Sequence, residues 1–377
     1  MSESAQAEIF NASNAPDIYE TGGRYGQQGV DFQRYWAVSR IIELVGADVP
    51  DFLILFETIQ DVLELDSANA PTRARIYQLK MQKTGEWTWK SLTGLPAQPR
   101  KKKGSTDMTE PVPFTKTPIG KLAAALAELD QIQAEGIFVS NSGCSAELEA
   151  GSTAGSVPIC ALTALCKDRR DEISPELAKL KKPIGPDVLH LHRTALSLDD
   201  LDTHIVGKVY GLLEVAAPSH AGQSRPFADS LFATVSARGR KTSPAPDFAG
   251  LVEHCGYSKA NFMEAVEALR SIPDRQAVVA SWLARLNTER MRISDLSRLQ
   301  NKLAQFFDRR LEKGEPNPTP LVEAVRIWVA ANPVGDSILD FLNAGTIAIQ
   351  AQLSGTPRDE IHVVLLLEGV SQCLDRT

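Results

Sequence analysis

The fold class is indicated by residues 51–82, which read DFLILFETIQDVLELDSANAPTRARIYQLKMQ. This stretch holds three short apolar runs, DFLILFE, DVLEL and ARIYQLKMQ, separated by the link TIQ and by the polar segment DSANAPTR, which together predict three strands. Ahead of them, Val38, Ile41, Ile42 and Val45 recur at helical spacing and predict an amphipathic helix over residues 31–46. A helix followed by three strands is typical of an α+β sheet with helices packed against it.

The remaining sequence extends this pattern and then changes character. KLAAALAELDQI predicts a helix, GIFVSNS a strand, ICALTALC a short helix or buried strand, and residues 187–197 a further strand. Residues 1–20 are polar and predict a loose arm or a short pairing strand. From Leu198 onward the spacing is helical throughout. We therefore expect an α+β domain over residues 1–217, with a mixed sheet flanked by helices, and an all-α domain over residues 218–377.

The composition is that of an ordinary globular protein, with 43% hydrophobic and 23% charged residues in a chain of 377. It excludes wholesale disorder, a collagen-like fibre and a disulfide-dense miniprotein. No apolar run approaches the ~20 residues of a membrane span, and the N-terminus lacks the features of a secretory signal. We therefore expect a cytoplasmic protein that does not associate with a membrane. The five cysteines form no CxxC pair, which favours reduced, packed thiols, and His190 and His192 have no third ligand nearby and are taken as structural.

The charge is unevenly distributed along the chain. The formal net charge is −7, yet residues 71–103 carry nine lysines and arginines against the single acid Glu86, a local +8 that leaves −15 for the rest. An acidic protein with one basic segment fits local attraction to phosphates, and a solvated lysine-rich loop is the alternative. Trp87 and Trp89 in this segment either stack on bases or are buried. The candidate DNA-binding residues are Arg73, Arg75, Lys83, Lys90, Lys101, Lys102 and Lys103.

The strongest candidate for chemistry is the set Glu57, Asp61, Gln78 and Lys80. Side chains alternate across a strand, so residues 78 and 80 project from one face, where a carboxylate on the neighbouring strand can meet them. Carboxylate and amide oxygens suit Mg²⁺, and a lysine can neutralise charge that grows on a phosphate during hydrolysis. A structural ion pair would explain the same D…QxK pattern. By contrast, GGRYGQQG lacks the ending of a nucleotide-binding phosphate loop.

Three segments, GGRYGQQGVDFQRYWA, FETIQDVLEL and IYQLKMQ, also carry a family resemblance in their order and spacing. Over residues 18–215 the chain resembles the N-terminal double-stranded-DNA endonuclease module of bacterial anti-phage effectors. That module occurs in cyclic-oligonucleotide (CBASS) effectors, in some STAND-type defence proteins and in partners of the HerA ATPase. It belongs to the PD-(D/E)XK superfamily, so the resemblance implies a restriction-endonuclease-like mixed sheet in the domain over residues 1–217. The sequence departs from the usual acid of that superfamily at Gln78, and an amide should bind metal more weakly.

The resemblance implies a role for each matching residue. Asp61 matches the metal-binding aspartate, Gln78 the second ligand and Lys80 the catalytic lysine. Glu57 is a candidate further ligand, and Gln33 matches a glutamine of the opening motif that orients the site.

The predicted function is a Mg²⁺- or Mn²⁺-dependent endonuclease acting on double-stranded DNA as an anti-phage effector. Cutting both strands requires a homodimer or higher oligomer. The C-terminal half shows neither a cyclic-nucleotide sensor nor a nucleotide-binding loop, which favours assembly with a HerA-like ATPase. The alternatives are a catalytically silent DNA-binding or scaffold protein that keeps the nuclease fold, and a nuclease acting on RNA or on single strands.

Overall fold

The computed structural model describes residues 2–15, 27–95, 112–239, 245–271, 275–313 and 319–374. The chain divides into two compact units, Met1–Leu269 and Arg270–Thr377, and the second has a hydrophobic core of its own. In these described ranges, no helix combines the length and the hydropathy that crossing a bilayer requires.

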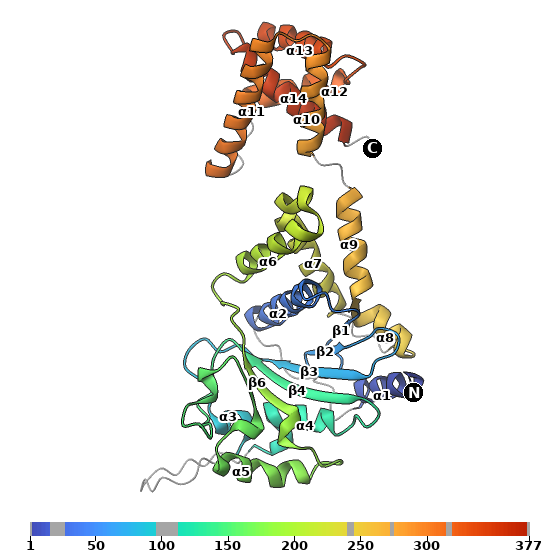
Figure 1. Ribbon diagram of the computed structural model, residues 1–377, viewed down its shortest axis with the longest axis vertical. Helices are drawn as coiled ribbons and strands as arrows, with labels where there is room; N and C mark the ends of the chain where they lie inside the picture. Colours follow the sequence, from blue (N-terminus) through green and yellow to red (C-terminus); the bar gives the residue numbers. More distant parts are fainter. Residues whose placement is uncertain are drawn as a thin grey trace. The chain divides into compact units, whose positions relative to one another are not determined.

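A seven-stranded mixed sheet forms the centre of the first unit, with strand order β5-β6-β4-β3-β2-β1-β7. Figure 1 labels β1, β2, β3, β4 and β6 of this sheet. The strands β3, β4 and β6 run parallel, whereas β2, β1 and β7 follow antiparallel on one side and β5 pairs antiparallel with β6 on the other. This confirms the predicted α+β fold. The strand bounds are β1 Leu53–Phe56, β2 Val62–Leu65, β3 Arg73–Leu79, β4 Gln133–Ser140, β5 Ile159–Ala161, β6 Leu189–Arg193 and β7 Gly256–Ser258.

Helices cover both faces of this sheet, because its central strands are apolar on both sides. On β3, Ile76 belongs to one core cluster while Tyr77 and Leu79 belong to the other, as the alternation of side chains along a strand requires. One face packs against α2 Gln27–Gly46, α6 Leu201–Ala216, α7 Ser224–Arg238 and α9 Lys259–Ser271. The other packs against α1 Ser2–Ser13, α3 Trp89–Thr93, α4 Pro118–Leu126, α5 Lys167–Ala178 and α8 Phe248–Cys255.

Two parts of this unit differ from the sequence prediction. The N-terminal segment is the helix α1 rather than a loose arm or strand, because Ala5, Ile9 and Ala12 share one face and are buried. The region after Leu198 is not wholly helical, because β7 adds to the edge of the sheet beside β1. The ambiguous segment ICALTALC begins as the strand β5 and continues as a short 3₁₀ turn, Leu162–Ala164.

The second unit is a bundle of helices, as predicted for the C-terminal region. Its core is apolar, and α14 packs against α10, α11, α12 and α13. Thr319 caps α12 with Pro320 in the first turn, as the sequence predicts. The chain divides into its two compact units between residues 269 and 270, whereas we placed the domain boundary at residue 217. Residues 218–269 therefore belong to the unit that contains the sheet. The bounds are α10 Arg275–Thr288, α11 Ile293–Lys313, α12 Pro320–Ala331, α13 Ile338–Gln352 and α14 Arg358–Leu374.

Candidate active site

The candidate site lies where the hairpin β1–β2 meets the end of β3. Residues 57–61 turn the chain, and the turn is closed by a 3.1 Å hydrogen bond from Glu57 N to Asp61 O. Its tip is buried, with Thr58, Ile59 and Gln60 each at most 4% exposed. Gln60 adopts the left-handed conformation, with φ of 58°, as the last residue of a three-residue hairpin loop commonly does. A buried turn of this kind places Asp61 at the start of β2 in a fixed position.

Asp61 and Lys80 meet across the neighbouring strands. Continuing the β2–β3 register by one pair from Val62 and Tyr77 sets Asp61 opposite Gln78. Asp61 Oδ2 accepts a 2.6 Å hydrogen bond from Leu79 N and lies 3.9 Å from Lys80 Nζ. Both side chains are shielded from water, with 5% of Asp61 and 12% of Lys80 exposed. The carboxylate and the amine therefore lie on the same face of the sheet, at the ends of two interior strands, as the strand alternation predicts.

Gln78 is the most deeply buried polar member of the site, at 1% exposure. Its Nε2 donates a 3.3 Å hydrogen bond to Gln60 Oε1. Its Oε1 is buried, and the described residues offer it no hydrogen-bond donor. A buried amide oxygen without a donor is costly, so it calls for a specific partner. A hard cation beside Asp61 is such a partner, so the residues present fit a divalent metal ion.

The two outlying members differ in their placement. Gln33 of α2 donates a 3.3 Å hydrogen bond to Leu79 O, so it contacts the backbone between Gln78 and Lys80. The Glu57 side chain is exposed, and its backbone has a φ of 50°. Its Cγ lies close to Gly239, since a methyl group added to that glycine would be 3.8 Å from it. Its backbone N–H closes the turn by donating to Asp61 O, while its role as a metal ligand stays a prediction. Within the described ranges, no cluster of three His, Cys, Asp or Glu side chains has the geometry to hold a metal.

The predicted DNA-binding residues that the structure describes do not form one cluster. Arg73 and Arg75 lie at the opposite end of β3 from Lys80, and Arg75 pairs with Glu64 and Glu135. Lys83 and Lys90 are exposed beyond the end of β3, nearer the site in sequence. Lys101, Lys102 and Lys103 lie outside the described residues. The DNA-binding role of all these side chains stays a prediction.

The two tryptophans of the basic segment pack inside the protein. Trp89 is 3% exposed in the core. Trp87 donates a 2.9 Å hydrogen bond from Nε1 to Ser140 Oγ and packs edge-on against Phe138. Of the two predicted alternatives, stacking on bases or burial, burial is therefore correct for Trp89. Trp87 is half-buried and is held by its hydrogen bond to Ser140.

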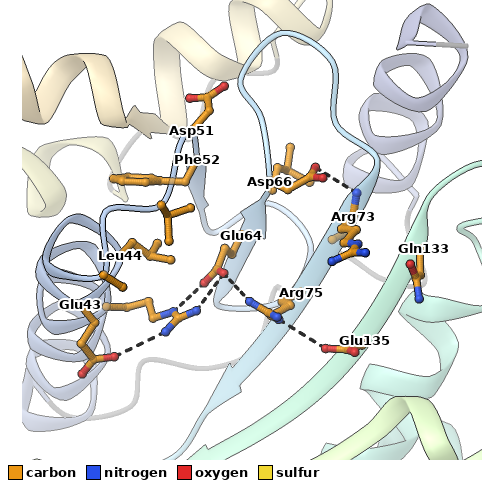
Figure 2. A pocket seen from close by; sticks show the side chains of 15 residues that line it. Glu43, Leu44, Asp51, Phe52, Glu64, Asp66, Arg73, Arg75, Gln133 and Glu135 are labelled. Carbon is orange, nitrogen blue, oxygen red and sulfur yellow. Dashed lines mark hydrogen bonds and ion pairs between the residues drawn. The ribbon is translucent and has the colours of Figure 1, made fainter.

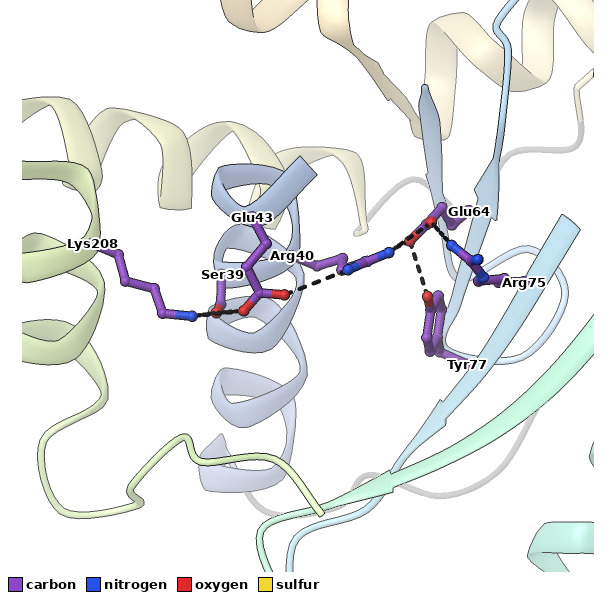
Figure 3. Close-up of polar contacts among 7 residues, drawn as sticks. All are labelled: Ser39, Arg40, Glu43, Glu64, Arg75, Tyr77 and Lys208. Atoms are coloured by element: carbon purple, nitrogen blue, oxygen red, sulfur yellow. Dashed lines mark hydrogen bonds and ion pairs between the residues drawn. The ribbon is translucent and has the colours of Figure 1, made fainter. Parts of the chain in front are cut away.

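A charged network that the sequence reasoning missed ties α2 to the sheet (Figure 3). Glu64 is 5% exposed, and it accepts hydrogen bonds of 2.7 and 3.0 Å from Arg40, 3.0 Å from Arg75 and 3.0 Å from Tyr77. Burial raises the pKa of Glu64, but the hydrogen bonds and charges of the two arginines outweigh it, and the net pKa is lowered. The alternation on β2 and β3 places Glu64, Arg75 and Tyr77 on one face, but Arg40 reaches them from another element.

This network forms one side of a pocket of about 390 Å³ (Figure 2). The pocket lies at the start of β3, and its wall carries acidic and basic side chains together. The Asp66 carboxylate is already hydrogen-bonded within the protein, because it accepts from the backbone N–H groups of Thr72 and Arg73. Since internal pairs compensate Glu64, Arg40 and Arg75, we assign this network a structural role in holding α2 against the sheet.

The cysteines and the histidine pair agree with a structural role. All five cysteines are free thiols, and burial raises the pKa of Cys144 to about 11, which keeps that thiol protonated. His190 and His192 lie on β6, two residues apart. Burial lowers the pKa of His192.

A mixed sheet flanked by helices, with Asp61, Gln78 and Lys80 meeting at adjoining strand ends, is the arrangement that we predicted for a restriction-endonuclease-like nuclease domain. A comparison with family models then gives the particular family: the model described as Cap4, dsDNA endonuclease domain, matches residues 21–239. This match covers more than half of the 377 residues, and the chain belongs to that family. It confirms the resemblance to the endonuclease module of anti-phage effectors. Comparisons with curated proteins and with solved structures find no match.

Proposed function

We propose that this protein is a metal-dependent endonuclease that hydrolyses duplex DNA as the effector of an anti-phage defence system. The observation that carries the proposal is the convergence of Asp61, Gln78 and Lys80 in a chain of the Cap4 dsDNA endonuclease family. Gln78 Oε1, which has no donor among the described residues, supports it independently, because a structural ion pair between Asp61 and Lys80 gives no reason to bury such an amide oxygen.

Asp61 and Gln78 would hold the metal ion through a carboxylate and an amide oxygen. A bound divalent ion supplies Lewis-acid polarisation of the scissile phosphate and a more acidic water. Lys80 Nζ, held 3.9 Å from Asp61 Oδ2, is placed to stabilise the negative charge that grows on the phosphate oxygens as water attacks the phosphorus. The bond from phosphorus to the leaving sugar oxygen then breaks. Low exposure of Lys80 and Asp61 strengthens this charge stabilisation, since little water screens it.

The identity of the metal follows from the ligand chemistry. Hard oxygen ligands suit Mg²⁺ or Mn²⁺. Because Gln78 is neutral, the site has one negative charge fewer than a pair of carboxylates would give. We therefore expect weak metal binding by the free protein, with phosphate oxygens of bound DNA completing the coordination.

The assembly part of the proposal concerns partners. One site of this kind hydrolyses one strand at a time, so cleavage of both strands requires two copies facing the duplex. We propose a homodimer or higher oligomer, with the helical unit Arg270–Thr377 as the assembly module. We further propose a HerA-like ATPase as the activating partner. The support is the family membership together with a C-terminal unit that is a plain helical bundle in its described residues.

Plasmid cleavage tests the catalytic proposal directly. Purified protein, with and without the partner ATPase, is incubated with plasmid and Mg²⁺ or Mn²⁺, and chelation by EDTA should abolish cleavage. Lys80→Ala should reduce cleavage by about a hundredfold or more while DNA binding persists. Lys179→Ala, which removes an exposed surface lysine of the same type, is the matched control and should cleave like the parent. Full activity of Lys80→Ala would refute the assignment, and DNA binding without cleavage under any metal would favour the silent scaffold.

A further inference from the structure

The buried hairpin tip contributes a contact that fixes the orientation of Gln78. Gln60 Oε1 accepts the 3.3 Å hydrogen bond from Gln78 Nε2, and both side chains are at most 4% exposed. Gln60 comes from the tip of the β1–β2 turn, whereas Gln78 lies on β3. The contact therefore joins two elements that are 18 residues apart.

An amide, unlike a carboxylate, has two different ends. Its oxygen accepts hydrogen bonds and binds hard cations, whereas its NH₂ group only donates. If the Gln78 amide rotated by half a turn while Gln60 kept the orientation that the structure gives it, the Gln78 oxygen would face Gln60 Oε1, which is also an acceptor. The NH₂ group would then face the place where a metal has to bind. Holding Nε2 toward Gln60 is what leaves Oε1 available.

We propose that Gln60 is a positioning residue, which sets the end of the Gln78 amide that faces the metal ion. This inference rests on the proposed function. It explains why a polar residue occupies a buried turn in the left-handed conformation, with φ of 58°, where residues other than Gly, Asn and Asp are strained. It also explains how the site uses glutamine where a carboxylate, having two equivalent oxygens, would need no such partner.

A double-mutant cycle separates this role from simple packing. All proteins carry Lys80→Met, so that duplex DNA can be present without being cut. The substitutions are Gln60→Met, Gln78→Glu and both together. The readout is the Mn²⁺ dissociation constant, measured by the electron paramagnetic resonance signal of free Mn²⁺ in the presence of duplex DNA. Urea unfolding of each variant checks that the fold persists.

The expected result is a background-dependent effect. With Gln78 present, Gln60→Met should raise the Mn²⁺ dissociation constant about tenfold, as loss of an outer-shell contact to a metal ligand commonly does. In the Gln78→Glu background it should change that constant by less than about threefold, because either carboxylate oxygen can bind the metal. Gln60→Glu presents only acceptors to Gln78 Nε2 and should bind Mn²⁺ at least as tightly as the parent.

A second substitution keeps the test decisive if Gln60→Met fails to fold. Gln60→Asn tolerates the left-handed backbone, and its shorter side chain withdraws the acceptor, so it should show the same background-dependent loss. An equal loss in both backgrounds would overturn the inference in favour of packing. So would an unchanged Mn²⁺ affinity in Gln60→Met or Gln60→Asn while Gln78→Ala weakens binding. By contrast, Mn²⁺ affinity that does not respond to Gln78→Ala would overturn the metal assignment itself.

Discussion

Replacing Glu64 with glutamine should destabilise the sheet-bearing unit by about 3 kcal/mol. Glu64 accepts four hydrogen bonds, three of them from the guanidinium groups of Arg40 and Arg75. Glu64→Gln keeps the size of the side chain but turns an NH₂ group toward these donors, and it leaves the largely buried Arg40 with only the more exposed Glu43, 3.5 Å away, as a counter-charge. Removing one partner of a buried ion pair commonly costs about 3–5 kcal/mol. We take the lower value because Arg75 is 44% exposed and can turn to water.

The assay is hydrogen exchange with mass spectrometry over a urea series. Peptides from α2, β2 and β3 report on the Glu64 network, and peptides from α12 and α14 in the other compact unit serve as the internal reference. In Glu64→Gln the first set should unfold at lower urea, while the reference peptides keep the midpoint of the parent. Arg75→Gln removes the more exposed partner and should cost at most about 1 kcal/mol.

The pH dependence has a definite sign. The lowered pKa of Glu64 means that its stabilisation is fully present above its ordinary value of 4.5 and is lost as the pH falls through the folded value. The stability difference between the parent and Glu64→Gln should therefore shrink on acidification below pH 4.5. A loss for Glu64→Gln no larger than that for Arg75→Gln, or a difference that grows in acid, would refute this account.

Three further predictions concern other sites. His362 is 4% exposed, and burial, followed by the charge of Arg358, lowers its pKa to about 4. The bundle should therefore lose about 2–3 kcal/mol of stability between pH 6.5 and 4.5. His362→Gln should flatten this loss, as measured by the urea midpoints of α14 peptides. Gln33→Leu removes a single hydrogen bond to Leu79 O and should lower kcat/KM for plasmid cleavage about fivefold, and an unchanged rate would remove Gln33 from the site. Lys83→Gln and Lys90→Gln should each reduce the slope of log DNA affinity against log salt by about 0.9 if the lysine contacts a phosphate, whereas unchanged slopes would indicate solvated surface lysines.

The sequence predicted the parts of the fold that depend on local pattern. The helix α2 and the strands β1, β2 and β3 follow from the spacing of apolar residues within one segment. It did not predict α1, in which only three apolar residues form the buried face, or β7, which is three residues long. Both are stabilised by contacts with segments that are distant in sequence, and local propensity carries little information about such contacts.

The candidate site divides in the same way. Gln78 lies on β3, Lys80 directly follows that strand, and Asp61 directly precedes β2. The period of two along a strand therefore predicts from the sequence alone that these side chains meet. The contact of Gln60 with Gln78 depends on a turn that is buried and left-handed, and no local sequence signal indicates either property. The pairing of Arg40 with Glu64 likewise joins a helix to a strand 24 residues away. Alternation along β2 and β3 could have grouped Glu64 with Arg75, but not with Arg40.

The strand β7 bears on how this protein can be divided for experiments. The family match ends at residue 239, yet Leu53, Ile54 and Leu55 of β1 pair with residues 256–258. A fragment cut where the match ends would leave β1 with an open, apolar edge, and such edges recruit other chains and aggregate. A fragment that extends to residue 269 keeps this edge covered, so the limit of the recognisable nuclease sequence is not the limit of the smallest stable piece.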